Sequence, residues 1–341
     1  MTDVQPNQEP EPTWDPDWRA VAADHRGPLA RAWLALGVTA LALAGMYALL
    51  LVAARAPGTG AFFPTQDFFR VALVVHVDQS VLIWFLALGG VLWSLLGRPH
   101  RGLAWAGLAG AAGGCLLVAA SPFLGAAEPL LANYVPVLDH PLFLTGLAVF
   151  GLGVLLALAA YFGGSHPGLG WTNPVAVGTL SAALATLMAV VSLTWTLSGL
   201  SNAWEGKAYY EYLFWGPGHV IQFAYTQLML VAWIWLARNT GRPLPLDSRI
   251  LSGLLILGVL PLLAVVPLHV AFAPDAPQTR IAFTRLMQWG NGLAAVPIGI
   301  ALLVALARGR GADTDPAAVP VRRALTASLT LFAAGGALSL M

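Results

Sequence analysis

The sequence predicts an all-α, multi-pass membrane protein with about nine transmembrane helices. Of its 341 residues, 58% are hydrophobic and only 10% are charged, whereas soluble domains are about a quarter charged and just under half apolar. Apolar runs long enough to cross a bilayer also recur along the chain, separated by short polar stretches. The formal net charge is +1 and no basic patch is present, which argues against nucleic-acid binding.

The first 27 residues form a separate N-terminal tail. They are polar, and acidic residues and prolines alternate along them. A secretory signal has the opposite order, because it opens with basic residues and then becomes apolar. We therefore expect a mostly disordered cytoplasmic tail over residues 1–27, followed by a single transmembrane helical domain over residues 28–341.

Nine runs in that domain reach the roughly 20 apolar residues that a membrane-spanning helix needs. Polar stretches rich in glycine and proline separate them, and these residues cannot continue a helix without cost. The predicted spans are 29–53, 71–97, 102–124, 138–162, 174–199, 212–237, 250–272, 282–307 and 322–340.

The lysines and arginines predict the orientation of these spans. Of the 17 basic residues, about two thirds lie near helix ends on the same side as the N-terminus, and cytoplasmic loops carry this excess. We therefore expect the N-terminus in the cytoplasm and the protein in the inner (cytoplasmic) membrane. With nine spans, the C-terminus lies outside.

Four of the seven histidines lie at or within predicted spans, where ionisable groups are costly and mark functional sites. Counted from the helix ends at 1.5 Å per residue, His76, His219 and His269 all lie about 5–10 Å from the outer boundary. Imidazole is a common ligand of iron, copper and zinc, which makes these three candidate metal or heme ligands. The alternative is that each one hydrogen-bonds a neighbouring helix.

Three other residues have simpler interpretations. His140 stands between an aspartate and a proline at a predicted helix start, so we expect it to cap that helix. Asp78, two residues after His76, is either a proton-handling group or an interfacial acid. Cys115 is the single cysteine and is expected to be a small core residue.

Three stretches containing these histidines resemble the catalytic subunit (subunit I) of the heme-copper oxidase superfamily, which includes cytochrome c oxidases and nitric oxide reductases. Phe69–His76 resembles its second helix, and Tyr212–His219, which reads Tyr-Leu-Phe-Trp-Gly-Pro-Gly-His, resembles its sixth. The seventh and eighth helices are matched by Leu268-His269, Thr279-Arg280 and the run 295–300, which reads Ala-Val-Pro-Ile-Gly-Ile. The resemblance extends over residues 28–341.

This resemblance implies a function and a ligand set. His76 would be an axial ligand of a low-spin heme, and His219 and His269 would bind copper. The reaction would be respiratory electron transfer to oxygen or nitric oxide, in the lipid bilayer and together with other respiratory oxidase subunits. The resemblance assigns no catalytic residue to this chain.

The chain also departs from the family pattern. Leu268 replaces the first histidine of the family's pair, Phe223 replaces a tyrosine four residues after the sixth-helix histidine, and Ala301 replaces a lysine. The family's tenth helix, which carries two further heme ligands, would follow Met341. We therefore expect either the front portion of a longer or split protein, in which further sequence or another chain supplies the missing helices, or a relative that lost the catalytic centre.

Two other functions remain open. The first alternative is a non-catalytic heme- or copper-binding protein, or an oxidase-assembly scaffold, on the same fold. The second alternative is a transporter. It is favoured less, because we expect few of the broken helices and intramembrane charged pairs that mark transport paths.

Overall fold

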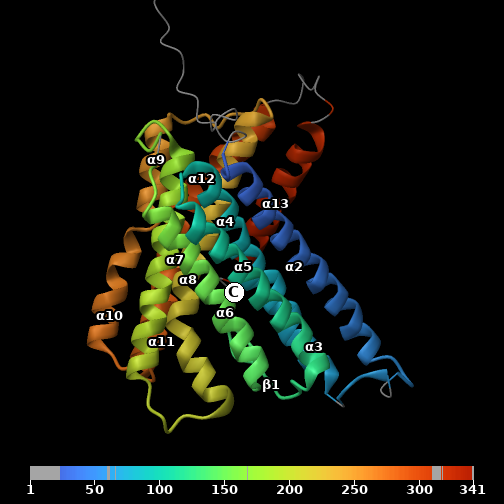
Figure 1. Ribbon diagram of the computed structural model, residues 1–341. Helices are drawn as coiled ribbons and strands as arrows, with labels where there is room; N and C mark the ends of the chain where they lie inside the picture. Colours follow the sequence, from blue (N-terminus) through green and yellow to red (C-terminus); the bar gives the residue numbers. More distant parts are fainter. Residues whose placement is uncertain are drawn as a thin grey trace, which may run out of the picture.

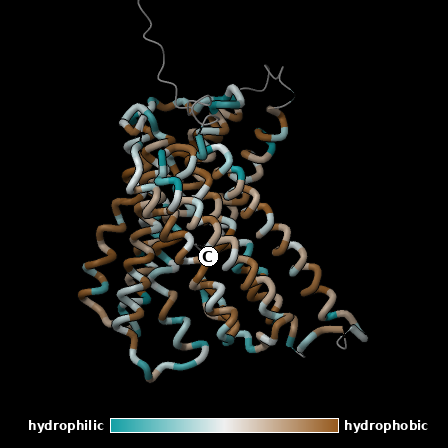
Figure 2. The backbone as a smooth tube through the Cα atoms, viewed as in Figure 1, coloured by the Kyte–Doolittle hydropathy of each residue, from teal (hydrophilic) through white to brown (hydrophobic). Residues whose placement is uncertain are grey.

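The computed structural model describes residues 24–59, 62–65, 67–166, 168–308, 316 and 318–339. Within them, eight helical segments are long and apolar enough to cross a membrane, and they pack side by side in one bundle (Figure 1). The chain is therefore an all-α, multi-pass integral membrane protein, as predicted. Figure 2 shows the apolar residues along the lengths of the helices and the hydrophilic residues gathered at the two ends of the bundle.

Most of the predicted tail, residues 1–23, lies outside the described residues. The first span begins at Arg26, slightly earlier than the predicted tail boundary. Asp24 explains this start, because its carboxylate accepts the backbone N–H of Arg26 at 2.8 Å and pairs with the Arg26 guanidinium at 2.7 Å. An acidic side chain before the first turn satisfies a free N–H group and stabilises the helix start.

Five of the eight spans are single helices, one of them with a short 3₁₀ extension. They are α2 (Arg26–Ala54), α5 (Arg101–Ala120) with η3 (Ser121–Leu124), α6 (Pro141–Phe162), α7 (Pro174–Gly199) and α8 (Gly206–Asn239).

The other three spans are interrupted, which corrects the expectation of few broken helices. A π-helical turn divides the second span, 3₁₀ turns at Pro261 divide the seventh, and a break at Asn291 divides the eighth. Proline lacks the N–H that would continue the α-helical ladder. The segments are α3 (Phe68–Val77), η2 (Asp78–Ile83) and α4 (Trp84–Leu96); α9 (Ser248–Leu257), η4 (Leu260–Ala264) and α10 (Val265–Ala271); and α11 (Pro277–Gly290) and α12 (Gly292–Arg308).

The ninth predicted span corresponds to helix α13 (Ala318–Ser339). It is a helix of 22 residues, but it is not among the eight described segments that are apolar enough to span. Arg322 and Arg323 lie inside it and lower its apolar character.

A short β-hairpin, which the sequence did not predict, lies between α5 and α6. Strands β1 (Pro129–Leu130) and β2 (Val137–Leu138) pair antiparallel, with Pro129 opposite Leu138. We call residues 129–138 the hairpin. It lies at the same end of the bundle as the start of α3 and the loop between α7 and α8 (Figure 1).

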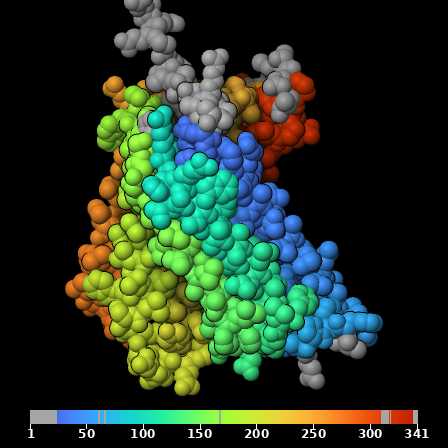
Figure 3. All heavy atoms as spheres, in the orientation of Figure 1, coloured from blue at the N-terminus to red at the C-terminus, as the bar shows by residue number. Residues whose placement is uncertain are grey.

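Glycines allow α5 and α6 to pack with their backbones in contact. A Cβ added to Gly107 would lie 2.8 Å from the backbone nitrogen of Ala157, and one added to Gly146 would lie 2.9 Å from that of Val118. Small residues of this kind are typical of close helix pairs in membranes. In Figure 3, α5 lies beside the obliquely running α2 on the visible face of the bundle.

Candidate functional site

His76 lies near the end of α3, against α2. Its Nδ1 is 2.8 Å from the backbone oxygen of Ala44. A carbonyl can only accept a hydrogen bond, so Nδ1 carries the proton and Nε2 carries a lone pair. No described residue hydrogen-bonds Nε2, and the ring is half-buried. This arrangement, with one ring nitrogen fixed by a backbone carbonyl and the other free, is typical of metal-binding histidines.

The π-helical turn η2 begins at Asp78, two residues after His76. The Ser80 hydroxyl donates to the His76 carbonyl at 2.7 Å, and this bond fixes the backbone where the helix widens. Asp78 is fully buried, and neither of its carboxylate oxygens has a hydrogen-bond partner among the described residues. Single π turns inside helices occur frequently at functional sites.

His219 lies in α8 and is almost fully buried, with 2% of its surface exposed. Its Nδ1 is 2.6 Å from the Trp215 carbonyl one turn earlier, and its Nε2 is 2.8 Å from the Tyr134 hydroxyl. Because the carbonyl accepts from Nδ1, the unprotonated Nε2 accepts from the phenol. Both nitrogens of this imidazole therefore have partners.

Tyr134 is a site residue that the sequence did not reveal. It has a φ of 70°, a left-handed conformation that is uncommon for a large side chain. Its ring packs directly on Gly218, where any Cβ would overlap the ring. Burial, together with the negative charge of Glu211, raises the pKa of Tyr134 to about 12. The phenol therefore keeps its proton near neutral pH and can donate to His219.

Further contacts tie the hairpin to α8 and α11. Glu211 accepts the backbone N–H and the side-chain amide of Asn133 at 2.9 and 2.5 Å. Arg280 lies 3.8 Å from the same carboxylate and stacks 4.2 Å above the Trp215 ring. We call Asn133, Tyr134, Glu211, Trp215, His219 and Arg280 the hairpin network.

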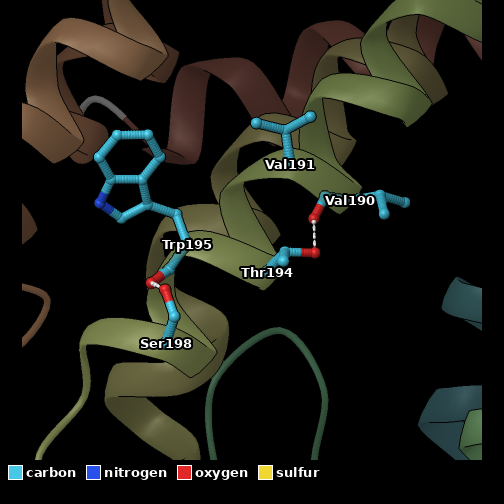
Figure 4. A pocket seen from close by; sticks show the side chains of 5 residues that line it. All are labelled: Val190, Val191, Thr194, Trp195 and Ser198. Atoms are coloured by element: carbon cyan, nitrogen blue, oxygen red, sulfur yellow. Dashed lines mark hydrogen bonds between the residues drawn. The ribbon is translucent and has the colours of Figure 1, made fainter.

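His269 lies in α10, with 5% of its surface exposed. Its Nε2 is 2.8 Å from the Ser192 hydroxyl of α7, and its Nδ1 is buried without a hydrogen-bond partner among the described residues. The ring stacks on Trp195 and packs against Phe283, at centroid distances of 5.9 and 4.9 Å. Trp195 also lines a shallow groove on the outside of α7 with Val190, Val191, Thr194 and Ser198 (Figure 4).

The three candidate histidines thus share no hydrogen-bond partner. The described residues contain no group of three or more His, Cys, Asp or Glu side chains that could hold one metal ion. His219 also lies further from the start of its helix than predicted, because α8 begins at Gly206 rather than at residue 212. The heme and copper assignments stay predictions.

The residues that depart from the oxidase pattern lie in apolar packing. Phe223 is fully buried in a cluster that Leu268 joins as a partly buried member. Tyr225 stacks on Phe85 at a centroid distance of 4.6 Å, and Ala301 is in the core. The predicted cap is confirmed, because the side chain of His140 accepts the backbone N–H of Leu142 at 3.2 Å.

Proteins similar to this chain include one from Rickettsia prowazekii and one from Aquifex aeolicus. An uncharacterized protein of Rickettsia prowazekii (strain Madrid E) is 30% identical over 316 residues, which cover 83% of this chain and 61% of that protein. An uncharacterized protein of Aquifex aeolicus (strain VF5) is 31% identical over 219 residues, which cover 61% of this chain and 53% of that protein. The chain thus matches only 61% and 53% of the lengths of these relatives. No protein-family model matches it.

Proposed function

We propose that this chain is a heme-binding electron-transfer protein of the inner membrane, built on the plan of heme-copper oxidase subunit I. The observation that carries the proposal is the state of His76. Its Nδ1–H is held by the Ala44 carbonyl at 2.8 Å, which leaves Nε2 free inside a membrane-spanning bundle.

The contacts of His76 suit an imidazole that would hold a heme iron. A heme iron takes a neutral imidazole nitrogen, and a hydrogen bond to the other ring nitrogen fixes the ring and raises its basicity. Ala44 supplies that bond from α2, and the Ser80 hydroxyl holds the His76 backbone at 2.7 Å. A bound heme would supply one-electron transfer, and the chain would supply orientation and a water-poor environment.

The copper assignment has less support. The Nε2 of His219 is occupied by Tyr134, and the Nε2 of His269 is occupied by Ser192. Of these two imidazoles, only the Nδ1 of His269 is free. A copper ion at His219 would have to displace the Tyr134 hydroxyl, so we derive no chemical step through copper.

Reduction of oxygen or nitric oxide is therefore proposed only for a complete assembly. In that assembly, other respiratory oxidase subunits, or a chain that supplies further histidine-bearing helices, would contribute the remaining ligands. The relatives from Rickettsia and Aquifex extend beyond the region that this chain matches.

The second candidate is a non-catalytic heme-binding or oxidase-assembly protein on the same fold. The specific observation in its favour is the Tyr134–His219 bond, because it occupies the nitrogen that the oxidase reaction would need. This candidate keeps heme binding at His76 and lacks gas reduction.

The test is the reduced pyridine spectrum of the protein purified from its native membrane, which counts and types hemes. The proposal predicts at least one heme per chain. Consumption of oxygen or nitric oxide by the same preparation then separates the two candidates, because only the oxidase consumes the gas. A preparation without heme contradicts the proposal and leaves only the oxidase-assembly form of the second candidate.

A further inference from the structure

The two halves of the eighth span expose different kinds of side chain. In α11, the exposed residues include the charged Arg285 and the amide Gln288. In α12, the residues exposed before the last turn are all apolar, as contact with lipid requires: Leu293, Val296, Ile300 and Leu303. One half of the span therefore presents a surface suited to lipid, and the other half does not.

Helix α11 buries one side and exposes the opposite side. Thr279 and Phe283 are buried where α11 packs against α8 and α10. Ile281, Arg285 and Gln288 follow one another at i, i+4 and i+7, so they share the exposed side. The ring of Trp289, 73% exposed, lies beside them. We call Ile281, Arg285, Gln288 and Trp289 the α11 exposed face.

Arg285 and Gln288 lie deep in the span rather than at its border. Counted from Pro277 at 1.5 Å per residue, they lie about 12 and 17 Å along a hydrocarbon core about 30 Å thick. Among the described residues of the eight spans, they are the exposed charged and amide side chains that lie eight or more residues from both ends. A long arginine can extend toward the membrane surface, but the shorter Gln288 cannot.

Neither side chain is satisfied by the chain itself. No described residue forms a hydrogen bond or an ion pair with Arg285 or Gln288. The neighbouring Thr284 differs, because its hydroxyl donates to the Arg280 carbonyl one turn earlier at 2.8 Å. An exposed threonine can therefore face lipid, whereas an unpaired guanidinium or amide in hydrocarbon is costly. These two side chains need partners from outside the bundle.

We propose that the α11 exposed face docks a transmembrane helix of another protein. This helix brings an aspartate or glutamate carboxylate to Arg285 and a hydrogen-bonding side chain to Gln288. Arginine pairs with carboxylates through two parallel hydrogen bonds, and polar side chains join helices within membranes. Trp289 adds a large apolar contact, and tryptophan and arginine are the residues that most often dominate protein interfaces.

A second copy of this chain does not offer the required carboxylate. Among the described residues of the eight spans, the acidic side chains are Asp78 and Glu211. Asp78 is fully buried, and Glu211 is engaged by Asn133 and Arg280. A two-fold contact of α11 with itself would also bring Arg285 toward its own copy, and like charges repel. The charge of the face thus favours a different protein.

Photo-cross-linking of the full chain in its native membrane tests this proposal. The photoreactive residue benzoylphenylalanine replaces Ile281 on the α11 exposed face or, as the matched control, Ile300 on α12; these isoleucines are 52% and 58% exposed. Position 281 should give a discrete product with a second protein. Peptide mass spectrometry should place the link in a membrane span that contains aspartate or glutamate. Position 300 should give lipid adducts only.

Variants of the chain labelled at position 281 test the charge pairing. Arg285→Gln should lower the yield of the product about tenfold, because it removes a hydrogen-bonded charge pair. Thr284→Val should leave the yield unchanged, since its hydroxyl is bonded within its own helix. Reversing both charges, with Arg285→Glu here and arginine at the mapped acidic position of the partner, should restore the product.

Several results would overturn the proposal. They are lipid adducts alone at position 281, a product with a second copy of this chain, and a partner span without an acidic residue. An unchanged yield in Arg285→Gln would also overturn it. The cross-link does not involve heme, so its failure is distinguishable from a failure of heme binding at His76.

Discussion

At the scale of single residues, the partner of each histidine decides which ring nitrogen is available. His76 gives Nδ1 to Ala44 and keeps Nε2 free, whereas His219 has both nitrogens engaged. His269 engages Nε2 with Ser192 and leaves Nδ1 buried without a partner. The three imidazoles therefore differ in which ring nitrogen is engaged. We propose a heme ligand only at His76, whose Nε2 has no hydrogen-bond partner among the described residues.

Substitution of two adjacent buried residues in η2, Asp78 and Gln79, should change the stability of the protein in opposite directions. Asp78 has two unpartnered oxygens, whereas Gln79 donates to the Cys115 carbonyl at 3.0 Å and accepts from its thiol at 3.2 Å. An unsatisfied buried polar group costs about 1–3 kcal/mol. Asp78→Leu should therefore raise the thermal unfolding temperature in detergent, and Gln79→Leu should lower it. If Asp78→Leu destabilises as much as Gln79→Leu does, the carboxyl has a bound partner.

Sequence patterns could predict some of these residue roles and not others. His140 was predictable as a cap, because its signal is local: an Asp-His-Pro run at a helix start. The role of Tyr134 was not, because it depends on a hairpin that docks on α8, far along the chain. The only signal was Gly218 next to His219, and a glycine does not say which side chain fills its space.

At the scale of secondary-structure elements, the α5–α6 pair depends on a seam of glycines. Gly114 lies in this seam, where a Cβ would come within 2.7 Å of the Cα of Phe150, whereas a Cβ on the neighbouring Gly113 would meet nothing within 4 Å. Position within the seam, rather than residue type, should therefore decide the effect of a substitution.

Gly114→Ala should destabilise the protein by about 1–3 kcal/mol through overpacking, and Gly113→Ala should be neutral or slightly stabilising. Thermal unfolding in detergent, followed by intrinsic fluorescence, measures both variants against the wild type. Equal behaviour of the two variants would mean that the helices are not packed as closely as described.

Hydropathy predicted where the spans lie but not that three of them are interrupted. Apolar runs predicted the existence of all eight spans, because length and apolarity determine membrane insertion. The break in the seventh span was visible as Pro261, but its 3₁₀ geometry depends on packing against Gly290, where a Cβ would lie 2.8 Å from the proline ring. The π turn at Asp78–Ile83 has no comparable local signal.

At the scale of the whole molecule, the bundle has two chemically different ends. The hairpin network and the α7–α8 loop occupy one end. The loop between α8 and α9 occupies the other, where Arg242 lies in the loop and Arg238 and Arg249 lie at the adjoining helix ends. Because basic residues mark cytoplasmic loops, we expect the hairpin end to face the outer side of the membrane.

Single-cysteine labelling tests this orientation. In a Cys115→Ala background, Ser201→Cys in the α7–α8 loop should react with a membrane-impermeant maleimide in right-side-out vesicles. Pro245→Cys in the α8–α9 loop should react only after the membrane is permeabilised. The reverse pattern would invert the assigned topology and place the hairpin network in the cytoplasm.

The heme content of His76→Ala, compared with that of His100→Ala, tests the central claim most directly. His100 is an exposed residue at the start of α5, so it controls for the loss of an imidazole. Both variants and the wild type are purified from the same membrane, and heme per chain is measured by the reduced pyridine spectrum. We predict that His76→Ala loses heme while His100→Ala and the wild type retain it. Equal heme in all three, or no heme in the wild type, would contradict the assignment of His76 as a heme ligand.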